Sequence, residues 1–161
     1  MKKILFLAML LVTLMSNAQA YSGKGDIKAQ VGAGFQNSAT AIHATADFGL
    51  GINMSYGVSG SYILNYAFGN ASDIALKDRV DIKVRFNANL GDVFGLDKKM
   101  DIYPGLDLGL KNFGAHLGFR YFFTDGFGLY SELELPIARY NNEIAGINNQ
   151  FVFNVGASFN L

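Results

Sequence analysis

The sequence contains no cysteine and only two prolines among its 161 residues. The absence of cysteine excludes disulfide bonds, thiolate metal ligands and a cysteine nucleophile. After residue 20, no apolar run approaches the roughly 20 residues that a membrane-spanning helix needs. The scarcity of proline, together with 19 glycines, suits a chain of many short strands joined by tight turns.

The chain also lacks an excess of charge of either sign. Lys and Arg number 13 in total, and Asp and Glu also number 13. Loss of Lys2 and Lys3 with the targeting segment described next leaves the remaining chain slightly acidic. No basic surface for nucleic acid is expected, so the sequence predicts no nucleic-acid partner.

The first twenty residues have the pattern of a secretory signal peptide. Lys2 and Lys3 give a positive start, residues 4–15 are apolar, and Ala18-Gln19-Ala20 is a small-x-small cleavage site. The alternative is a membrane anchor, but the apolar run is too short to span and no charged cluster follows it. We therefore predict cleavage after Ala20, which leaves residues 21–161 as a single domain.

The last twelve residues show the pattern that recurs along the rest of the chain. Phe151, Phe153 and Val155 alternate with small or polar residues such as Asn154 and Gly156. Period-two alternation of this kind predicts a β-strand with one apolar face. An apolar face of bulky aromatics opposite a face of small polar residues is typical of a strand in a small membrane barrel.

Seven further segments alternate in the same way. The eight predicted strands are residues 26–36, 40–52, 54–64, 79–90, 101–110, 114–123, 127–138 and 150–161. An even number of strands lets the last one return beside the first and close the sheet without edges. The pattern predicts an all-β, eight-stranded, antiparallel up-and-down transmembrane β-barrel with no helix after the signal. Pro104 cannot donate to a strand ladder, so a bulge is expected there.

Alternation alone fits two opposite proteins, a water-soluble ligand carrier and a membrane barrel. The volume of the interior distinguishes them, because an eight-stranded barrel has room for little more than its inward side chains. The apolar rows are too bulky for that space, whereas the polar rows are rich in Gly, Ser, Asn and Asp. Aromatic residues also gather near the strand ends, as a membrane interface requires. They are Phe48, Tyr56, Tyr121, Phe123, Phe127 and Phe159 at one end, and Phe35, Tyr62, Phe151 and Phe153 at the other.

Four stretches of the chain carry a resemblance to known proteins. They are KGDIKAQVGAGFQ, DRVDIKVRFNANLG, KMDIYPGLDLGLKNFGAHLGFRYFFTDGFG and NNQFVFNVGASFNL. In them the chain resembles a family of small, uncharacterised outer-membrane β-barrel proteins from flavobacteria and their relatives. More distantly, its architecture is similar to the eight-stranded membrane domains of the enterobacterial outer-membrane proteins A and X. The resemblance implies an outer-membrane location and a barrel fold, and it brings no activity.

The predicted inward faces carry a set of charged groups. These are Lys28, Asp47, Asp81, Lys83, Arg85, Asp107, Arg120, Glu132 and Glu134, together with His43 and His116. Charges in so narrow a lumen are expected to pair. Turns centred on residues 95 and 125 would place Lys83 opposite Asp107, His116 opposite Glu134 and Arg120 near Glu132. Glycines 105 and 118 would leave room for the long side chains. The network then either fills the barrel as a structural plug or lines an ion path.

Enzymatic chemistry is the third hypothesis for these residues. A lipid hydrolase would need a serine, a histidine and a carboxylate within hydrogen-bonding reach. Ser131 is expected to face outward, whereas His116 and Glu134 face the lumen, so this triad fails on geometry. Two scattered histidines with no carboxylate cluster predict no metal site. The sequence therefore predicts no catalytic residues, no metal site and no cofactor.

Two long segments interrupt the strand pattern. They run from Asn65 to Asp78 and from Arg139 to Asn149. Loops on a rigid scaffold often carry binding residues, so these loops could bind an extracellular ligand. Outer-membrane lipid and the barrel-assembly machinery are the other expected partners. The sequence thus favours a non-enzymatic envelope barrel with a structural or surface-interaction role, followed by a small low-conductance pore and, more remotely, a lipid-modifying enzyme.

Overall fold

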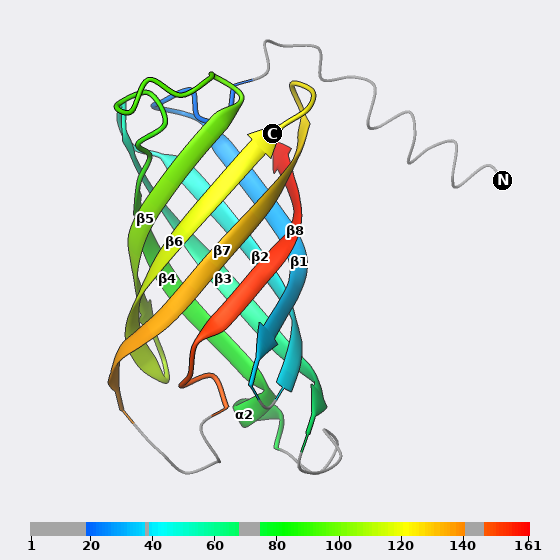
Figure 1. The fold of residues 1–161 in the computed structure, drawn as a ribbon. Helices are drawn as coiled ribbons and strands as arrows, with labels where there is room; N and C mark the ends of the chain where they lie inside the picture. The colour runs from blue at the N-terminus through cyan, green and yellow to red at the C-terminus, as the bar shows by residue number, and fades with distance from the viewer. Residues whose placement is uncertain (1–18, 38, 68–74, 141–146) are drawn as a thin grey trace, which may run out of the picture.

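The computed structural model describes residues 19–37, 39–67, 75–140 and 147–161. They form a closed barrel in which each strand pairs with the next and the first strand, β1, pairs with the last, β8 (Figure 1). The predicted all-β, eight-stranded antiparallel up-and-down barrel is therefore confirmed. Residues 1–18, which hold most of the predicted signal peptide, lie outside the described residues.

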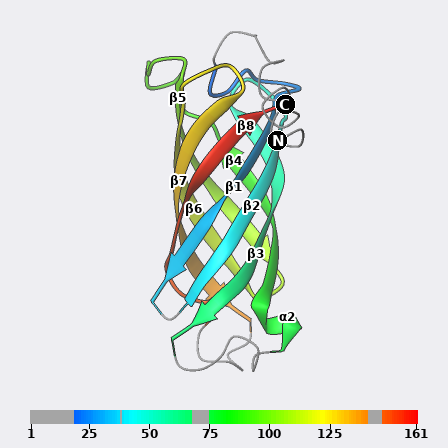
Figure 2. The ribbon, with the colours of Figure 1, turned by 90° about the vertical axis from the view of Figure 1, so that its right-hand side faces the viewer.

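The eight strands are 9 to 13 residues long and tilt around the barrel (Figure 2). They are β1 (Ile27–Gln36), β2 (Ala39–Gly49), β3 (Met54–Tyr66), β4 (Val80–Ala88), β5 (Met100–Gly109), β6 (Asn112–Phe122), β7 (Phe127–Arg139) and β8 (Val152–Asn160). We call the upper end in Figure 1, which holds residues 50–53, 91–99 and 123–126 and the C-terminus, the turn end. The opposite end holds the short helix α2 (Leu76–Arg79) and is called the loop end.

Alternation assigns the two faces of every strand as the sequence predicts. In β4, for example, Asp81 and Arg85 are buried inside the barrel, whereas Ile82 and Val84 are more than half exposed on its outside. Each strand carries an exposed apolar residue on its outer face. They are Val31, Ile42, Val58, Val84, Leu108, Leu117, Leu133 and Val155, one from each of β1 to β8 in order. These residues define an apolar belt that surrounds the barrel. The polar side chains fill the interior of the barrel.

Aromatic side chains gather on the outside at the turn end. The ring centroids of Phe48 and Tyr56 are 5.6 Å apart, and those of Tyr121 and Phe123 are 5.0 Å apart. Phe127 continues this row, because its ring lies 6.4 Å from that of Phe123. At the loop end, two further aromatics, Phe35 and Phe153, lie opposite each other on β1 and β8. The predicted grouping of aromatics at the two ends is thus present in the fold.

A pair of glycines lies where β1 and β8 close the barrel. Gly32 and Gly156 are opposite each other in register. A Cβ atom on Gly32 would overlap the backbone carbonyl oxygen of Val155 and lie 2.7 Å from the Cα atom of Gly156. A Cβ atom on Gly156 would overlap the carbonyl oxygen of Val31 in the same way. The two backbones approach too closely for any side chain, so glycine is required at both positions.

The prediction that no helix follows the signal is wrong in one detail. α2 is a single turn, formed because the amides of Asp78 and Arg79 both donate to the carbonyl oxygen of Ala75. The turn lies directly before β4, where the chain enters the barrel wall, so it can satisfy amides that no strand pairs. Among the described residues, no helix has both the length and the apolar character needed to cross a membrane.

The predicted bulge at Pro104 is also wrong. Pro104 pairs with Leu117 of β6 without a change of register, and the register shifts lie elsewhere, between Thr40 and Ala41 and between Phe113 and Gly114. On its other side, β4 and β5 pair as far as Gly105. Pro104 lies just beyond the last β4–β5 pair, so the hydrogen bond that proline cannot donate is not needed there. No extra residue is inserted as a bulge.

The glycine seam between β1 and β8 should be intolerant of any side chain. We expect Gly32→Ala to lower the free energy of unfolding by about 1–3 kcal/mol, because the backbones must separate. Gly60→Ala in β3 is the matched control, since its Cβ atom would meet only the carbonyl oxygen of Asp81, at 3.9 Å. That change should be neutral or stabilise by about 0.4–1 kcal/mol. Urea unfolding of the purified barrels compares the two, and equal midpoints would contradict the close approach.

Candidate functional site

The interior of the barrel is the only region where charged groups gather in large numbers within the part of the chain that is described. Seven acidic residues are buried there or at its turn end: Asp26, Asp47, Asp81, Asp101, Asp107, Glu132 and Glu134. Four basic residues accompany them: Lys28, Lys83, Arg85 and Arg120. All of the charged residues predicted to face the lumen do so, and they divide into three groups along the barrel axis.

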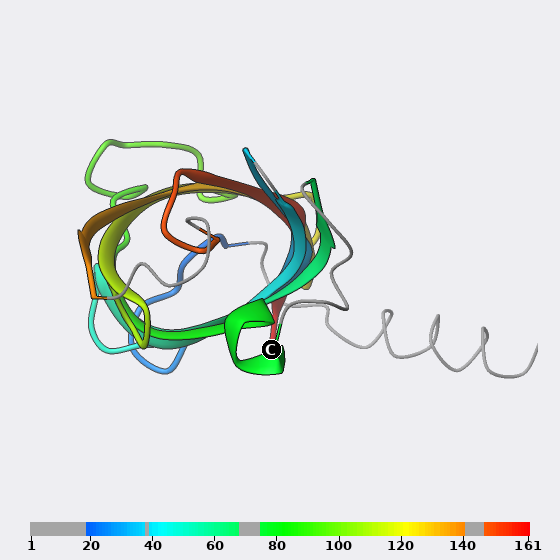
Figure 3. The same cartoon turned by 90° about the horizontal axis from the view of Figure 1, so that it is seen from below.

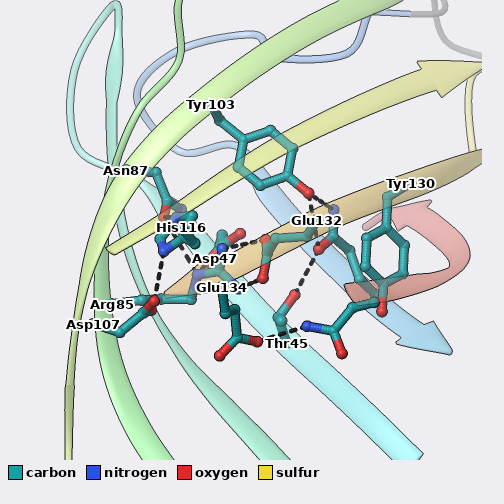
Figure 4. Close-up of polar contacts among 12 residues, drawn as sticks. Thr45, Asp47, Arg85, Asn87, Tyr103, Asp107, His116, Tyr130, Glu132 and Glu134 are labelled. Carbon is teal, nitrogen blue, oxygen red and sulfur yellow. Dashed lines mark hydrogen bonds and ion pairs between the residues drawn. The ribbon is translucent and has the colours of Figure 1, made fainter. Parts of the chain in front are cut away.

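The central group is built around Arg85 of β4. Its guanidinium group donates to Glu132 of β7, with Nη2 2.6 Å from Oε2 and Nη1 3.3 Å from Oε1. Its Nε atom lies 3.4 Å from a carboxylate oxygen of Asp47 on β2 (Figure 4). The Arg85 and Glu132 side chains are each 1% exposed, so this ion pair is shielded from water. The pair therefore links strands that are not neighbours in the sheet.

His116 of β6 extends the central group. Its Nδ1 atom lies 2.8 Å from a carboxylate oxygen of Asp107, and its Nε2 atom lies 2.8 Å from the amide oxygen of Asn87. Asn87 in turn donates to the hydroxyl of Ser55 at 3.0 Å. Both ring nitrogens thus have partners, which fixes the orientation of the imidazole.

The second group fills the turn end. Arg120 of β6 donates to Asp101 at 2.7 Å and to Asn89 at 2.6 Å, and its guanidinium carbon lies 4.6 Å from the centroid of the Tyr103 ring. The Tyr103 hydroxyl accepts a hydrogen bond from Gln30 at 3.1 Å. These side chains are buried, so the lumen is filled at this level by a stacked and hydrogen-bonded layer.

Residues before β1 lie over the same end. The Tyr21 hydroxyl lies 2.8 Å from the carbonyl oxygen of Gly51 and 2.5 Å from that of Met54. Burial raises the pKa of the Tyr21 hydroxyl above its ordinary value, because the phenolate would lose solvation. Lys28 donates to Asp26 at 2.6 Å, and its ammonium lies 5.3 Å from the centroid of the Phe122 ring.

The third group lies toward the loop end. Lys83 of β4 donates to Oε2 of Glu134 at 2.5 Å, and a carboxylate oxygen of Asp81 lies 3.8 Å from the same ammonium. The other oxygen of Glu134 accepts a hydrogen bond from Asn154 of β8 at 2.6 Å. A small cavity borders this group on the side of the loop end, where Asn148 and Ser61 also line it. Seen from that end, the segment before β8 turns across the opening of the barrel (Figure 3).

The model of a family described as "Family of unknown function (DUF6646)" matches residues 11–161. The chain belongs to this family. A search of curated proteins found no matching sequence.

One solved structure, reported as the de novo design of transmembrane beta-barrels, has a similar fold. It superimposes with a TM-score of 0.60, covering 87% of this chain and 98% of the designed one. The two sequences are only 11% identical, so the likeness shows the fold alone. The DUF6646 chain therefore shares its architecture with a barrel designed to cross a membrane.

Two of the predicted charge pairs are wrong, and one is confirmed. His116 lies opposite Glu134 as predicted. Lys83 lies opposite Gly109, because the turn after β4 centres one residue later than predicted and Arg85 takes the place opposite Asp107. Arg120 lies opposite Tyr130 of β7. Its ion pair is with Asp101, which lies opposite it on β5, instead of with Glu132.

The glycines predicted to make room for long charged side chains accommodate rings instead. A Cβ atom on Gly105 would overlap the imidazole of His116, and one on Gly118 would overlap the phenol of Tyr103. Each ring therefore lies flat across the glycine of a neighbouring strand. Tyr103 lies at an inward position of β5, but its neutral side chain gives no sign of this role in the sequence.

The predicted network contains only charged residues and histidines of the strands, and it therefore omits several members of the polar lumen. They are Gln30, Ser55, Asn87, Asn89, Tyr103, Tyr130 and Asn154, together with the acidic residues Asp26 and Asp101 at the turn end. Nearly all share the inward parity of their strands, and this signal was already present in the sequence.

The arrangement of Ser131 agrees with the prediction. Ser131 lies between Tyr130 and Glu132, which are both buried in the lumen, so its own side chain points to the outer face. His116 and Glu134 lie in the lumen on neighbouring strands. The three side chains are thus not brought together.

The prediction of no carboxylate cluster beside a histidine is wrong. His43, Glu132 and Glu134 are buried together, with one potential ligand atom from each lying within 4.8 Å of the others. His43 is on β2 and the two glutamates are on β7, so no strand pairing predicts this contact. It depends on which side chains cross the lumen, and local sequence does not encode that.

The central ion group should dominate the stability of the barrel. We expect Arg85→Leu to cost about 3–5 kcal/mol, because Glu132 and Asp47 would stay buried without their cation. Lys77→Leu removes the same charge from an exposed position of α2 and should change stability by no more than about 0.5 kcal/mol. Urea unfolding monitored by tyrosine fluorescence measures both. Equal losses would mean that Arg85 is solvated.

Proposed function

We propose that this protein is an integral outer-membrane barrel with a structural or surface-interaction role and no enzymatic activity. The observation that carries the proposal is the apolar belt, which surrounds a barrel whose interior is polar. Soluble monomers rarely expose contiguous apolar patches beyond a few hundred Å². A belt on all eight strands, flanked by aromatic side chains at both ends, instead matches the hydrocarbon layer and its two interfaces.

The outer membrane is the proposed location for three reasons. The sequence begins with the pattern of a cleaved signal peptide ending at Ala20. Closed barrels satisfy every backbone hydrogen bond within the sheet, as a lipid environment demands. The chain also resembles outer-membrane barrels of flavobacteria. Outer-membrane lipid and the barrel-assembly machinery are then its expected partners, with the loop end facing outward to meet any extracellular ligand.

A structural role is favoured over a pore by the packing of the lumen. Arg85 and Arg120 are almost completely buried, and Tyr103 and Phe122 are buried beside them. Arg85 is ion-paired with Glu132 across the lumen at the centre, and Arg120 is ion-paired with Asp101 of the adjacent strand at the turn end. A conducting path would have to break them, so the network supports a filled barrel. The outward direction of Ser131, away from His116 and Glu134, likewise supports a non-enzymatic role.

The long segments that begin at Asn65 and Arg139 are the proposed contact regions for a surface partner. Their central residues, 68–74 and 141–146, lie outside the described residues. Their bases are well connected, because Lys111 donates to the carbonyl oxygen of Asp78 at 2.7 Å and Asn148 donates to the same oxygen at 3.1 Å. A rigid base of this kind suits loops that bind.

A charge placed on the apolar belt tests whether that belt faces lipid. We expect Val84→Arg, at the middle of β4, to destabilise the barrel in phospholipid vesicles by about 2–4 kcal/mol. Val93→Arg is the matched control, because Val93 is 59% exposed and Val84 is 58% exposed, but Val93 lies in a turn. It should cost about 0–1 kcal/mol. If both variants unfold at the wild-type urea concentration, the belt faces water and the proposal fails.

Planar-bilayer recording distinguishes the filled barrel from a pore. We expect purified protein to insert without producing reproducible current steps. Steps that change in size in Glu132→Ala, but not in the exposed-turn variant Asp97→Ala, would establish a pore lined by the ion network. Release of lysophospholipid from vesicles by the same protein would instead contradict the non-enzymatic role.

A further inference from the structure

A histidine and two glutamates meet inside the barrel between its centre and its loop end. His43 reaches inward from β2, and Glu132 and Glu134 reach inward from β7. All three are buried, and one nitrogen and two carboxylate oxygens lie within 4.8 Å of one another. Imidazole nitrogen and carboxylate oxygen are both ligands of zinc and similar divalent ions.

The imidazole of His43 is oriented so that one of its two nitrogens makes no hydrogen bond. Its side chain is 3% exposed, and its Nδ1 atom lies 3.2 Å from the hydroxyl of Tyr130. Its Nε2 atom has no hydrogen-bond partner, although it is buried and directed at the glutamates. A metal-binding histidine commonly has this arrangement, with the far nitrogen held by a hydrogen bond and the near one free for the ion.

The spacing of the nitrogen and the nearest oxygen also fits an ion between them. Nε2 of His43 lies 3.4 Å from Oε1 of Glu134 in a geometry that makes no hydrogen bond. Two ligands of a tetrahedral zinc ion, each bound at about 2.0–2.1 Å, are about 3.3–3.4 Å apart. The two atoms are therefore as far apart as neighbouring zinc ligands.

The charge of the lumen favours a cation at this place. Seven buried carboxylates face four basic side chains, which leaves three negative charges in excess when the imidazoles are neutral. Lys83 and Asn154 each donate to one oxygen of Glu134, and Arg85 donates to both oxygens of Glu132. These contacts do not use every lone pair of the carboxylates, and a divalent ion would offset most of the excess charge.

A cavity borders the site on the side of the loop end. The cavity lined by His43, Glu134 and Asn154 has about 20 Å³ of space for the centre of a water-sized sphere. About 10–15 Å³ is enough for one water molecule, so an ion of similar size fits. The same cavity reaches Asn148, at the loop end of the barrel.

We propose that the barrel binds one divalent transition-metal ion of the zinc class, with Nε2 of His43 and one oxygen each of Glu134 and Glu132 as ligands. A water molecule from the cavity completes the tetrahedron. Tyr130 acts as a positioning residue that holds the imidazole through Nδ1. The site depends only on the lumen and not on the membrane location of the barrel, so the two proposals stand or fall separately.

Zinc titration of the purified chain without an affinity tag tests the site. We expect isothermal calorimetry to give one Zn²⁺ per wild-type barrel. His43→Asn should weaken binding by more than the 10–100-fold typical of losing an outer-shell partner, and Tyr130→Phe should weaken it by about 10-fold. His116→Asn is the matched control, because His116 is the other histidine of the chain and already has partners on both nitrogens. It should bind as the wild type does.

X-ray absorption of the zinc-loaded wild type tests the ligands without any variant. The spectrum should show one imidazole and otherwise oxygen neighbours. No saturable binding by the wild type, an absorption spectrum without imidazole, or equal affinity in a folded His43→Asn variant would each overturn the proposal. If His43→Asn fails to fold, the absorption spectrum of the wild type decides.

Discussion

Eight strands enclose a space only wide enough for their own inward side chains, and the rest of this structure follows from that restriction. A charged group in such a space must find a partner among the other inward side chains, because there is little water to solvate it. Arg85 meets Glu132 and Asp47, and Arg120 meets Asp101 and Asn89. Large side chains must also find space, which glycines 105 and 118 provide for the rings of His116 and Tyr103. Polarity inside and bulk outside are two consequences of one limited volume.

The polar contacts across the lumen add a specificity that the strand ladders lack. A ladder of backbone hydrogen bonds can slip by two residues and keep every side chain on its correct face. A slip between β4 and β5 would move Asp107 away from Arg85, and one between β6 and β7 would separate His116 from Glu134. Because Arg85 joins β4 to β7 and β2, its position is fixed by strands on several sides. The buried ions therefore favour this register over shifted ones.

The sequence predicted the faces well and the pairings less well, for a physical reason. Alternation is a local property, so the inward positions of Arg85 and Glu134 could be read directly from β4 and β7. The partner of a side chain depends on where each turn centres, and an error of one residue there moved Lys83 from Asp107 to Gly109. The contact of His43 with Glu134 is harder still to predict from the sequence. It crosses the lumen between β2 and β7, which share no ladder, and so depends on barrel tilt and stagger that no single segment encodes.

Asn148 joins three parts of the loop end although it belongs to no strand. Its backbone amide donates to Gln36 of β1, its side chain donates to the carbonyl of Asp78, and its own carbonyl accepts from Asn112 of β6. It adopts a φ of 63°, a conformation that asparagine tolerates better than most residues. These three hydrogen bonds therefore tie the barrel wall together at the loop end through described residues alone. Because none of these bonds uses residues 68–74 or 141–146, a foreign peptide could replace either of those stretches without removing a bonding partner of Asn148.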